Sequence, residues 1–266
     1  MDFMLKKYQK LLTSFKDAGY KFVTFEQYLD EKPDGKIIIL RHDVDELAEN
    51  ALEMARLEKT LGIIATYYFR RVKQSDKPSI IREVADMGME IGYHYEDLSR
   101  AEGNMDEAVD SFRRNLDYFR TYYPVKTVCM HGSSSSKYDN RDIWKAHKLE
   151  NFGLAGEPYL NVDFNKVFYL TDTGYAWDGG KYAVRDVVQS IFLQKYHSSD
   201  EIMQALKNEE FPEQIMILAH TLWTDSVAQW VALHIREFLR NRVKLLAKNH
   251  PGIKKIYSNI VKAYWK

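Results

Sequence analysis

The chain of 266 residues has few of the features that mark secreted, membrane-spanning or nucleic-acid-binding proteins. Its single cysteine, Cys129, excludes an intramolecular disulfide, which fits a reducing compartment. The first residues lack the apolar core of a signal peptide, and no apolar run approaches the length of a membrane span. Basic and acidic residues balance at 38 each, so the net charge gives no reason to expect nucleic acid. We therefore expect a cytoplasmic protein with no nucleic-acid partner.

Charge is nevertheless unevenly distributed along the chain. Residues 236–266 contain nine lysines and arginines and one acid, Glu237. These basic residues alternate with Leu, Ile, Tyr and Trp, which predicts a basic amphipathic helical tail. Two interpretations remain open. The apolar face of the tail packs on the domain while its lysines are solvated, or the tail rests on the surface of an anionic membrane.

Short apolar runs alternate with helical patterns over most of the sequence. Each run is typical of a buried strand, and the segments between them carry the periodicity or the caps of helices. This alternation predicts a parallel sheet with right-handed crossovers, as either an open doubly wound sheet or a closed (β/α) barrel. We expect one domain over residues 1–266. The predicted strands lie within 36–40, 63–69, 89–95, 126–132, 166–172 and 214–220.

Polar side chains follow five of these predicted strands. A single histidine at a strand end is more often a hydrogen-bonded bystander than a ligand, but here the feature recurs. In a parallel barrel the carboxyl ends of all strands meet at one rim, where active sites lie. Residues far apart in the sequence can therefore converge there. The polar residues at the strand ends are Arg41, His42, Asp43 and Asp45; His94 and Glu96; His131 and Ser133; Asp172; and His220.

Carboxylates and imidazoles together are typical ligands of a divalent metal such as zinc, with one position open for water. Asp43 and Asp45 are two residues apart, so they share one side of an extended strand, or they straddle a metal in a turn. One of them can bind the ion while the other accepts a proton from water. A histidine from a different strand can then protonate a leaving group.

Three motifs in this order resemble those of the polysaccharide deacetylases of the NodB-homology family: "RHDVD", "MEIGYH" and "ILAH". The resemblance covers roughly residues 36–225. That family has a distorted (β/α) barrel, usually of seven strands, and uses a divalent metal to remove acetyl groups from sugars. The resemblance therefore implies an α/β fold with a seven-stranded distorted barrel, to which extra N- and C-terminal helices are added. Two further stretches, "MHGSSSSKYDNRDIW" and "YLTDTGYAWDG", resemble a subgroup associated with bacterial surface-glycan synthesis.

The resemblance also implies roles for individual residues. Asp43 matches the catalytic base, Asp45 and His94 match metal ligands, and His220 matches the general acid. The loop that contains Asp172 and Trp177 lies where the family places an acid and a tryptophan in the pocket wall. These two and other rim residues are our candidates for binding substrate. The further candidates are Tyr95, Glu96, Ser133 and Trp223, and we expect the aromatic ones, with Tyr93, to stack on sugar rings.

The sequence departs from the family pattern in two places. The family has a second histidine four residues after the first, and here that residue is Leu98, which cannot bind a metal. Glu96 or another residue replaces it, or the metal has been lost; our preferred replacement is His131, which ends the next strand. The family's arginine that orients the base is also missing from its usual motif. Arg41 either takes that role or forms an ion pair with a neighbouring helix.

The expected function is the metal-dependent, most simply zinc-dependent, removal of an acetyl group from an N-acetylated sugar or glycan. A membrane-resting tail would suit a lipid-linked glycan at the inner face of the membrane. Two alternatives remain. The protein is a catalytically impaired carbohydrate-binding protein on the same fold, or it hydrolyses another ester or amide, because the fold does not fix the bond that is cleaved.

Overall fold

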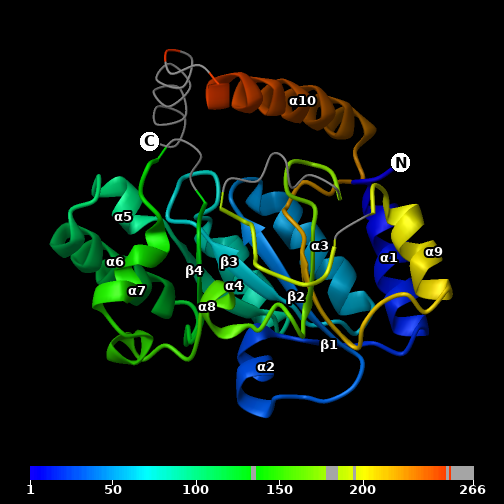
Figure 1. Ribbon diagram of the computed structural model, residues 1–266, viewed down its shortest axis with the longest axis horizontal. Coiled ribbons are helices and arrows are strands. Elements are labelled where there is room, and N and C mark those ends of the chain that lie inside the picture. The colour runs from blue at the N-terminus through cyan, green and yellow to red at the C-terminus, as the bar shows by residue number, and fades with distance from the viewer. Residues whose placement is uncertain (133–135, 178–184, 194–195, 250–251, 253–266) are drawn as a thin grey trace.

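The computed structural model of the protein describes residues 1–132, 136–177, 185–193, 196–249 and 252 (Figure 1). The chain forms one parallel sheet with helices along its flanks. Five of the predicted strand ranges each enclose a strand, but the strand predicted at 36–40 continues to Val44, so Arg41, His42 and Asp43 lie within it. The strands are β1 (Lys21–Val23), β2 (Ile37–Val44), β3 (Thr66–Phe69), β4 (Glu90–Tyr95), β5 (Val128–Met130), β6 (Phe168–Thr171) and β7 (Gln214–Leu218).

The seven strands are hydrogen-bonded in the order β5-β4-β3-β2-β7-β6, and β1 also pairs with β2. One edge of β2 has two successive partners, because β1 pairs with its first half and β3 with its second. In a flat sheet β2 and β5 would lie about 14 Å apart. Asp45 Oδ1 and His131 Nε2, which follow these two strands, are nevertheless separated by 3.3 Å. The sheet is therefore curled, which confirms the predicted α/β fold with a distorted seven-stranded barrel.

Ten α-helices occur in the described residues, and most of them flank the sheet. The expected N- and C-terminal additions correspond to α1 and α10, and Figure 1 shows α10 across one end of the molecule. The helices are α1 (Leu5–Asp17), α2 (Phe25–Glu31), α3 (Ala48–Thr60), α4 (Pro78–Asp86), α5 (Asp97–Arg100), α6 (Met105–Arg120), α7 (Ile143–Ala146), α8 (Pro158–Asn161), α9 (Ser199–Lys207) and α10 (Val227–Asn249).

Local sequence explains several helix ends. Pro78 occupies the first turn of α4, where its missing N–H costs nothing, and Gly88 follows the helix with a φ of +89°, a conformation that other residues rarely adopt. Asn104 caps α6 by accepting a hydrogen bond from the backbone of Glu107. These signals fix where the chain returns to the sheet and hence where each strand begins.

Both faces of the sheet are covered, and side chains alternate between them along each strand. On β2, Ile38 and Leu40 belong to the larger core beneath the flanking helices. Ile37 and Ile39 belong to a smaller core on the inner side of the curl. The inner row of β2 continues past Ile39 into Arg41 and Asp43. This alternation decides which residues at each strand end reach the candidate site.

Candidate metal-dependent active site

Asp43 is held in place by an arginine on its own strand. Arg41 Nη2 donates one hydrogen bond of 2.9 Å to Asp43 Oδ2 and another of 2.9 Å to the hydroxyl of Tyr159. Arg41 and Asp43 are both buried, so the ion pair is shielded from water. The ion pair of Arg41 is thus made with Asp43 and not with a neighbouring helix, and this is the contact needed to orient a base.

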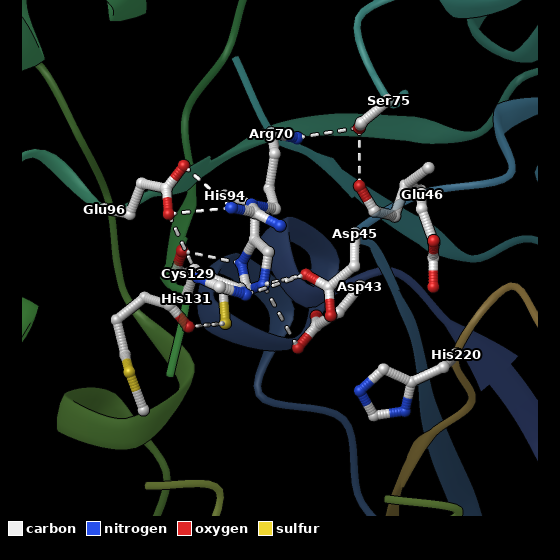
Figure 2. Close-up of polar contacts among 12 residues, drawn as sticks. Asp43, Asp45, Glu46, Arg70, Ser75, His94, Glu96, Cys129, His131 and His220 are labelled. Atoms are coloured by element: carbon white, nitrogen blue, oxygen red, sulfur yellow. Dashed lines mark hydrogen bonds and ion pairs between the residues drawn. The ribbon is translucent and has the colours of Figure 1, made fainter. Parts of the chain in front are cut away.

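Asp45 brings together two histidines from different strands (Figure 2). Its Oδ1 lies 3.4 Å from His94 Nε2 and 3.3 Å from His131 Nε2. Ligand atoms around tetrahedral zinc lie about 3.4 Å from one another, given bonds of about 2.0–2.1 Å. Asp45 Oδ1 is also a buried oxygen with no hydrogen-bond donor among the described residues. Its position between two imidazoles therefore fits a divalent cation.

Each histidine is oriented through its other ring nitrogen. His94 Nδ1 is 2.9 Å from the backbone oxygen of Cys129, which directs Nε2 toward Asp45. His131 Nδ1 is 3.3 Å from Glu96 Oε2. A second contact of this kind, from a carbonyl or carboxylate, is what usually fixes a metal-binding histidine. Glu96 was a candidate for binding substrate, and the structure places it behind His131 instead.

Glu96 is in turn held by two arginines. Arg70 Nη2 donates to both of its oxygens, at 2.9 and 2.8 Å, and Arg100 Nε donates to Oε1 at 2.9 Å. Burial alone would raise the pKa of Glu96, but Arg70, His131 and Arg100 hold it well below its usual value. The carboxylate thus remains charged, and His131 has a rigid anionic support.

The electrostatics of the cluster favour a bound cation. Burial alone would raise the pKa of Asp45, but His131, His94 and Arg70 hold it well below its usual value. Burial alone would lower the pKa of His94, but Asp43 and Asp45 raise it. The negative potential that draws a proton onto His94 would equally stabilise a metal ion in place of that proton.

Cys129 offers a second, overlapping set of donors that the sequence analysis did not consider. Asp43, His94 and Cys129 each offer one potential ligand atom, and these three atoms lie within 4.8 Å of one another. All three residues are buried. Cys129 and His131 are two residues apart at the end of β5, so they project to the same side. Burial raises the pKa of the Cys129 thiol well above its usual value, so without a cation it is protonated. Both sets share His94 and suit an ion of the zinc class.

His220 lies across Asp43 and Asp45 from the two other histidines (Figure 2). Its Nδ1 is 2.7 Å from Asp172 Oδ1, which also accepts its backbone N–H at 2.9 Å. Burial alone would lower the pKa of His220, but the hydrogen bond and charge of Asp172, with Asp45 and Asp43, raise it to about 10. His220 is therefore protonated at neutral pH, as a general acid must be. Asp172, a predicted substrate ligand, is fully buried and positions His220.

All four aromatic residues predicted to stack on sugar are fully buried, and the hydroxyl of Tyr93 donates a hydrogen bond to Asp97. Tyr95 alternates with His94 along β4 and so faces the helices, where its hydroxyl accepts a hydrogen bond from Trp144. The indole N–H of Trp177 donates to Ser199, and that of Trp223 donates to Asp172. None of the four rings offers a free face for stacking. Ser133, the last candidate, lies outside the described residues.

Arg70 and Tyr159 contribute to the site without having been predicted. Arg70 directly follows β3, so the rule of polar residues at strand ends applies to it as it does to the other strands. Tyr159 lies in α8, in a region without regular periodicity, and no sequence signal marks it. Leu98, at the position of the family's second histidine, is 3% exposed and belongs to the larger core. That position cannot serve the site, which leaves His131 as the second imidazole near Asp45.

Comparisons with known proteins identify similar folds only at low sequence identity. No family model matches the chain, and no curated protein matches it. Similar solved structures include members of carbohydrate esterase family 4. This is the family that the three motifs resemble.

One of these structures is a family 4 pseudoenzyme from Bacillus anthracis, with 12% identity and a TM-score of 0.45 over 78% of this chain and 62% of that chain. Another is a family 4 carbohydrate esterase from Streptomyces lividans in complex with acetate, with 14% identity and a TM-score of 0.38 over 78% and 88% of the two chains. A third is the peptidoglycan deacetylase PdaC from Bacillus subtilis, with 13% identity and a TM-score of 0.40 over 79% and 98%. The chain thus spans less than two thirds of the pseudoenzyme's length.

Proposed function

We propose that the protein is a metal-dependent hydrolase that removes an acetyl group from an N-acetylated sugar or glycan. The observation that carries this proposal is the convergence of His94 and His131 on the Asp45 carboxylate, at 3.4 and 3.3 Å, beside Asp43. Arg41 holds Asp43 through a buried ion pair, and His220 lies on the other side. A base, an acid and a cation site are thus brought together, which is the set that amide hydrolysis requires.

Asp43 acts as the general base. Its Oδ1 is buried and has no hydrogen-bond donor among the described residues, so it is free to accept a proton from the attacking water. Arg41 fixes Oδ2 and thereby sets the direction in which Oδ1 points. A divalent ion held by Asp45, His94 and His131 would polarise the acyl carbonyl and acidify the water. His220, kept protonated by Asp172, donates a proton to the departing amine.

The subgroup resemblance in the two longer motifs supports a substrate from bacterial surface-polysaccharide metabolism. An acetamido sugar meets the chemical requirement, because its acyl carbon takes up water and its nitrogen needs the proton that His220 provides. The leaving group of an ester would be an alkoxide, which needs a proton from His220 just as the departing amine does. Acetate release must therefore be compared between N-acetyl and O-acetyl sugars.

The test combines metal analysis with an assay of acetate release. The purified protein should bind zinc or cobalt at about one ion per chain and should release acetate from an N-acetylhexosamine-containing substrate. Asp43→Asn should abolish acetate release, and the exposed Asp110→Asn serves as the matched control that leaves it unchanged. Absence of both metal and acetate over a broad substrate panel would overturn the proposal and favour a carbohydrate-binding protein without activity.

A further inference from the structure

Helix α10 exposes an apolar stripe to solvent from Val227 to Leu246. Its members recur every three or four residues, which places them on one face of the helix. Each is between 37% and 58% exposed. The stripe is about 29 Å long at the usual helical rise. Its members are Val227, Val231, Ile235, Phe238, Leu239, Val243 and Leu246.

The face of α10 that meets the rest of the molecule is apolar near its start, where Trp230 and the buried Leu233 join the larger core, and polar from Arg236 onward. Arg236 and Arg240 form ion pairs with Glu46 at 2.7 and 3.3 Å. The side chain of Asn241 donates a hydrogen bond of 2.8 Å to the backbone oxygen of Gly174. From Arg236 onward the helix thus differs from an ordinary surface helix, because its polar face is turned inward and its apolar stripe is turned to solvent. The interpretation in which the apolar face of the tail packs on the domain is wrong for Phe238, Leu239, Val243 and Leu246, which are exposed. Residues 250–251 and 253–266 of the tail lie outside the described residues.

Helix α10 has five basic residues and one acid, and one of these cations lies within the exposed stripe. Glu237 is the one acid among residues 236–266, and it is buried beneath the helix in ion pairs with Arg236 and Arg240. Arg242 is exposed within the stripe, with its guanidinium 5.0 Å from the centre of the Phe238 ring. A second copy of the chain would bring the same cations to this face and repel it. An anionic lipid surface complements both the charge and the stripe.

Helix α10 lies next to the candidate site. Glu46, which it binds, follows Asp45 directly, and Gly174 is two residues beyond Asp172. The inward face of α10 thus lies on the rim of the candidate site, next to Asp45 and to Asp172, the partner of His220. The apolar stripe faces away from that rim. A surface bound to the stripe would lie about one helix diameter, roughly 10 Å, from that rim.

We propose that α10 docks the protein on an anionic membrane, with its apolar stripe in the lipid interface and the rim of the candidate site beside the bilayer. No helix among the described residues is long and apolar enough to cross a membrane. Docking through α10 therefore gives a protein that lies on the bilayer. Resting on the proposed function, this placement selects an acetylated sugar attached to a lipid as substrate.

Vesicle co-sedimentation tests the docking without any assay of activity. The protein should sediment with vesicles of phosphatidylcholine and phosphatidylglycerol in equal parts, and far less with phosphatidylcholine alone. Ile235→Asp and Phe238→Asp should each lower partitioning by about tenfold or more, because each puts a charge into the apolar interface. Ile191→Asp is the matched control: Ile191 is 74% exposed but lies in a segment that contacts Asn165, before β6. Circular dichroism checks that all three variants are folded.

Four results would overturn the docking proposal. One is a wild type that ignores anionic vesicles, and another is a pair of α10 variants that bind them as wild type does. The third is a wild type that is dimeric in solution and becomes monomeric on Ile235→Asp, which would make the stripe an interface between copies. Deletion of 251–266 should leave the dependence on Ile235 in place; loss of that dependence would place membrane binding in the tail and not in α10.

The substrate consequence has its own readout. Acetate release from a vesicle-anchored N-acetylglucosaminyl lipid should fall with Ile235→Asp, while release from the soluble sugar should not change. If the proposed function fails, neither substrate is deacetylated although the vesicles are still bound. If docking alone fails, the soluble sugar is still deacetylated, and wild type and Ile235→Asp release acetate from the anchored lipid at the same rate.

Discussion

At the scale of single residues, the question is what replaces the family's second histidine at position 98. His131 lies 3.3 Å from Asp45 and is supported by Glu96. His131→Leu should therefore weaken zinc binding strongly, and Glu96→Gln should weaken it by about 10- to 100-fold, the usual effect of losing such a support. Competition with a chromophoric chelator measures both affinities without any substrate.

His147→Leu is the control for this series, because His147 lies at the end of α7, away from the candidate site. The alternative donor set predicts the opposite pattern. If His131→Leu retains the wild-type affinity for zinc and Cys129→Ser loses it, the ion is bound by Asp43, His94 and Cys129 instead.

A second residue-scale prediction concerns pH. His220 has a pKa raised to about 10 by Asp172. A general acid works only while protonated, so deacetylation should fall on the alkaline side only near pH 10. Asp172→Asn removes the charge that holds the proton, lowers the pKa of His220, and should move this alkaline limb to lower pH. The pH profile of kcat/KM measures the shift.

The same pair makes a prediction for stability. Because the folded pKa of His220 is raised, its contribution to stability is fully present below the unfolded value of about 6.5 and is lost as the pH rises through about 10. Urea denaturation should therefore show that Asp172→Asn destabilises the protein most near pH 6, and progressively less toward pH 10. An equal difference at both pH values would contradict the assigned pair.

Residue types and spacing predict most of the residues of this site, but not how deeply each side chain is buried. Asp43, Asp45, His94, His131 and His220 can be named because polar residues after apolar runs are visible in the sequence. The alternation along β4 puts His94 inside and Tyr95 outside, and a sequence can reveal this only once the strand boundaries are known. Trp177 and Trp223 look like rim aromatics in the sequence because nothing local shows that the chain folds over them. Their burial is a property of tertiary packing.

At the scale of secondary structure, β4 depends on a glycine that brings it close to β3. A Cβ added at Gly92 would lie 2.3 Å from the Tyr68 ring and 2.9 Å from the backbone oxygen of Thr127. Gly92→Ala should therefore push β4 away from its neighbours, lower stability by about 1–3 kcal/mol, and weaken zinc binding through His94. Urea denaturation and the chelator assay measure the two effects. Gly252→Ala, where a Cβ meets nothing within 4 Å, is the control.

The strands follow from sequence because the period of their side chains is local, and β3, β4 and β7 all lie within their predicted ranges of 63–69, 89–95 and 214–220. The orientation of α10 does not follow in this way. Its periodicity defines an apolar face and a polar face, but only the ion pairs with Glu46 show that, from Arg236 onward, the polar face is the one turned toward the molecule. The orientation of α10 is therefore decided by Glu46, a partner that is distant in the sequence.

At the scale of the whole molecule, a buried polar cluster joins four elements behind the site. Glu58 of α3 accepts hydrogen bonds of 2.6 Å from Tyr8 of α1 and 2.7 Å from Tyr67 of β3. His42 Nε2 of β2 is 2.9 Å from the same carboxylate, and its Nδ1 is 2.8 Å from the backbone oxygen of Ala219. The cluster therefore connects the outer helices to the strand that carries Asp43.

Glu58→Ala should be among the most destabilising single substitutions in the protein. It would leave Tyr8, Tyr67 and His42 buried without their shared acceptor, and removing one partner from a buried ionic network costs about 3–5 kcal/mol. Glu83→Ala is the matched control, because its ion pair with Arg56 is exposed and should leave the urea midpoint unchanged. Equal midpoints for the two variants would show that the cluster does not hold α1 and α3 to the sheet. A lower midpoint for Glu58→Ala alone would show that β2, the strand that carries Asp43, is stabilised by residues that never touch the substrate.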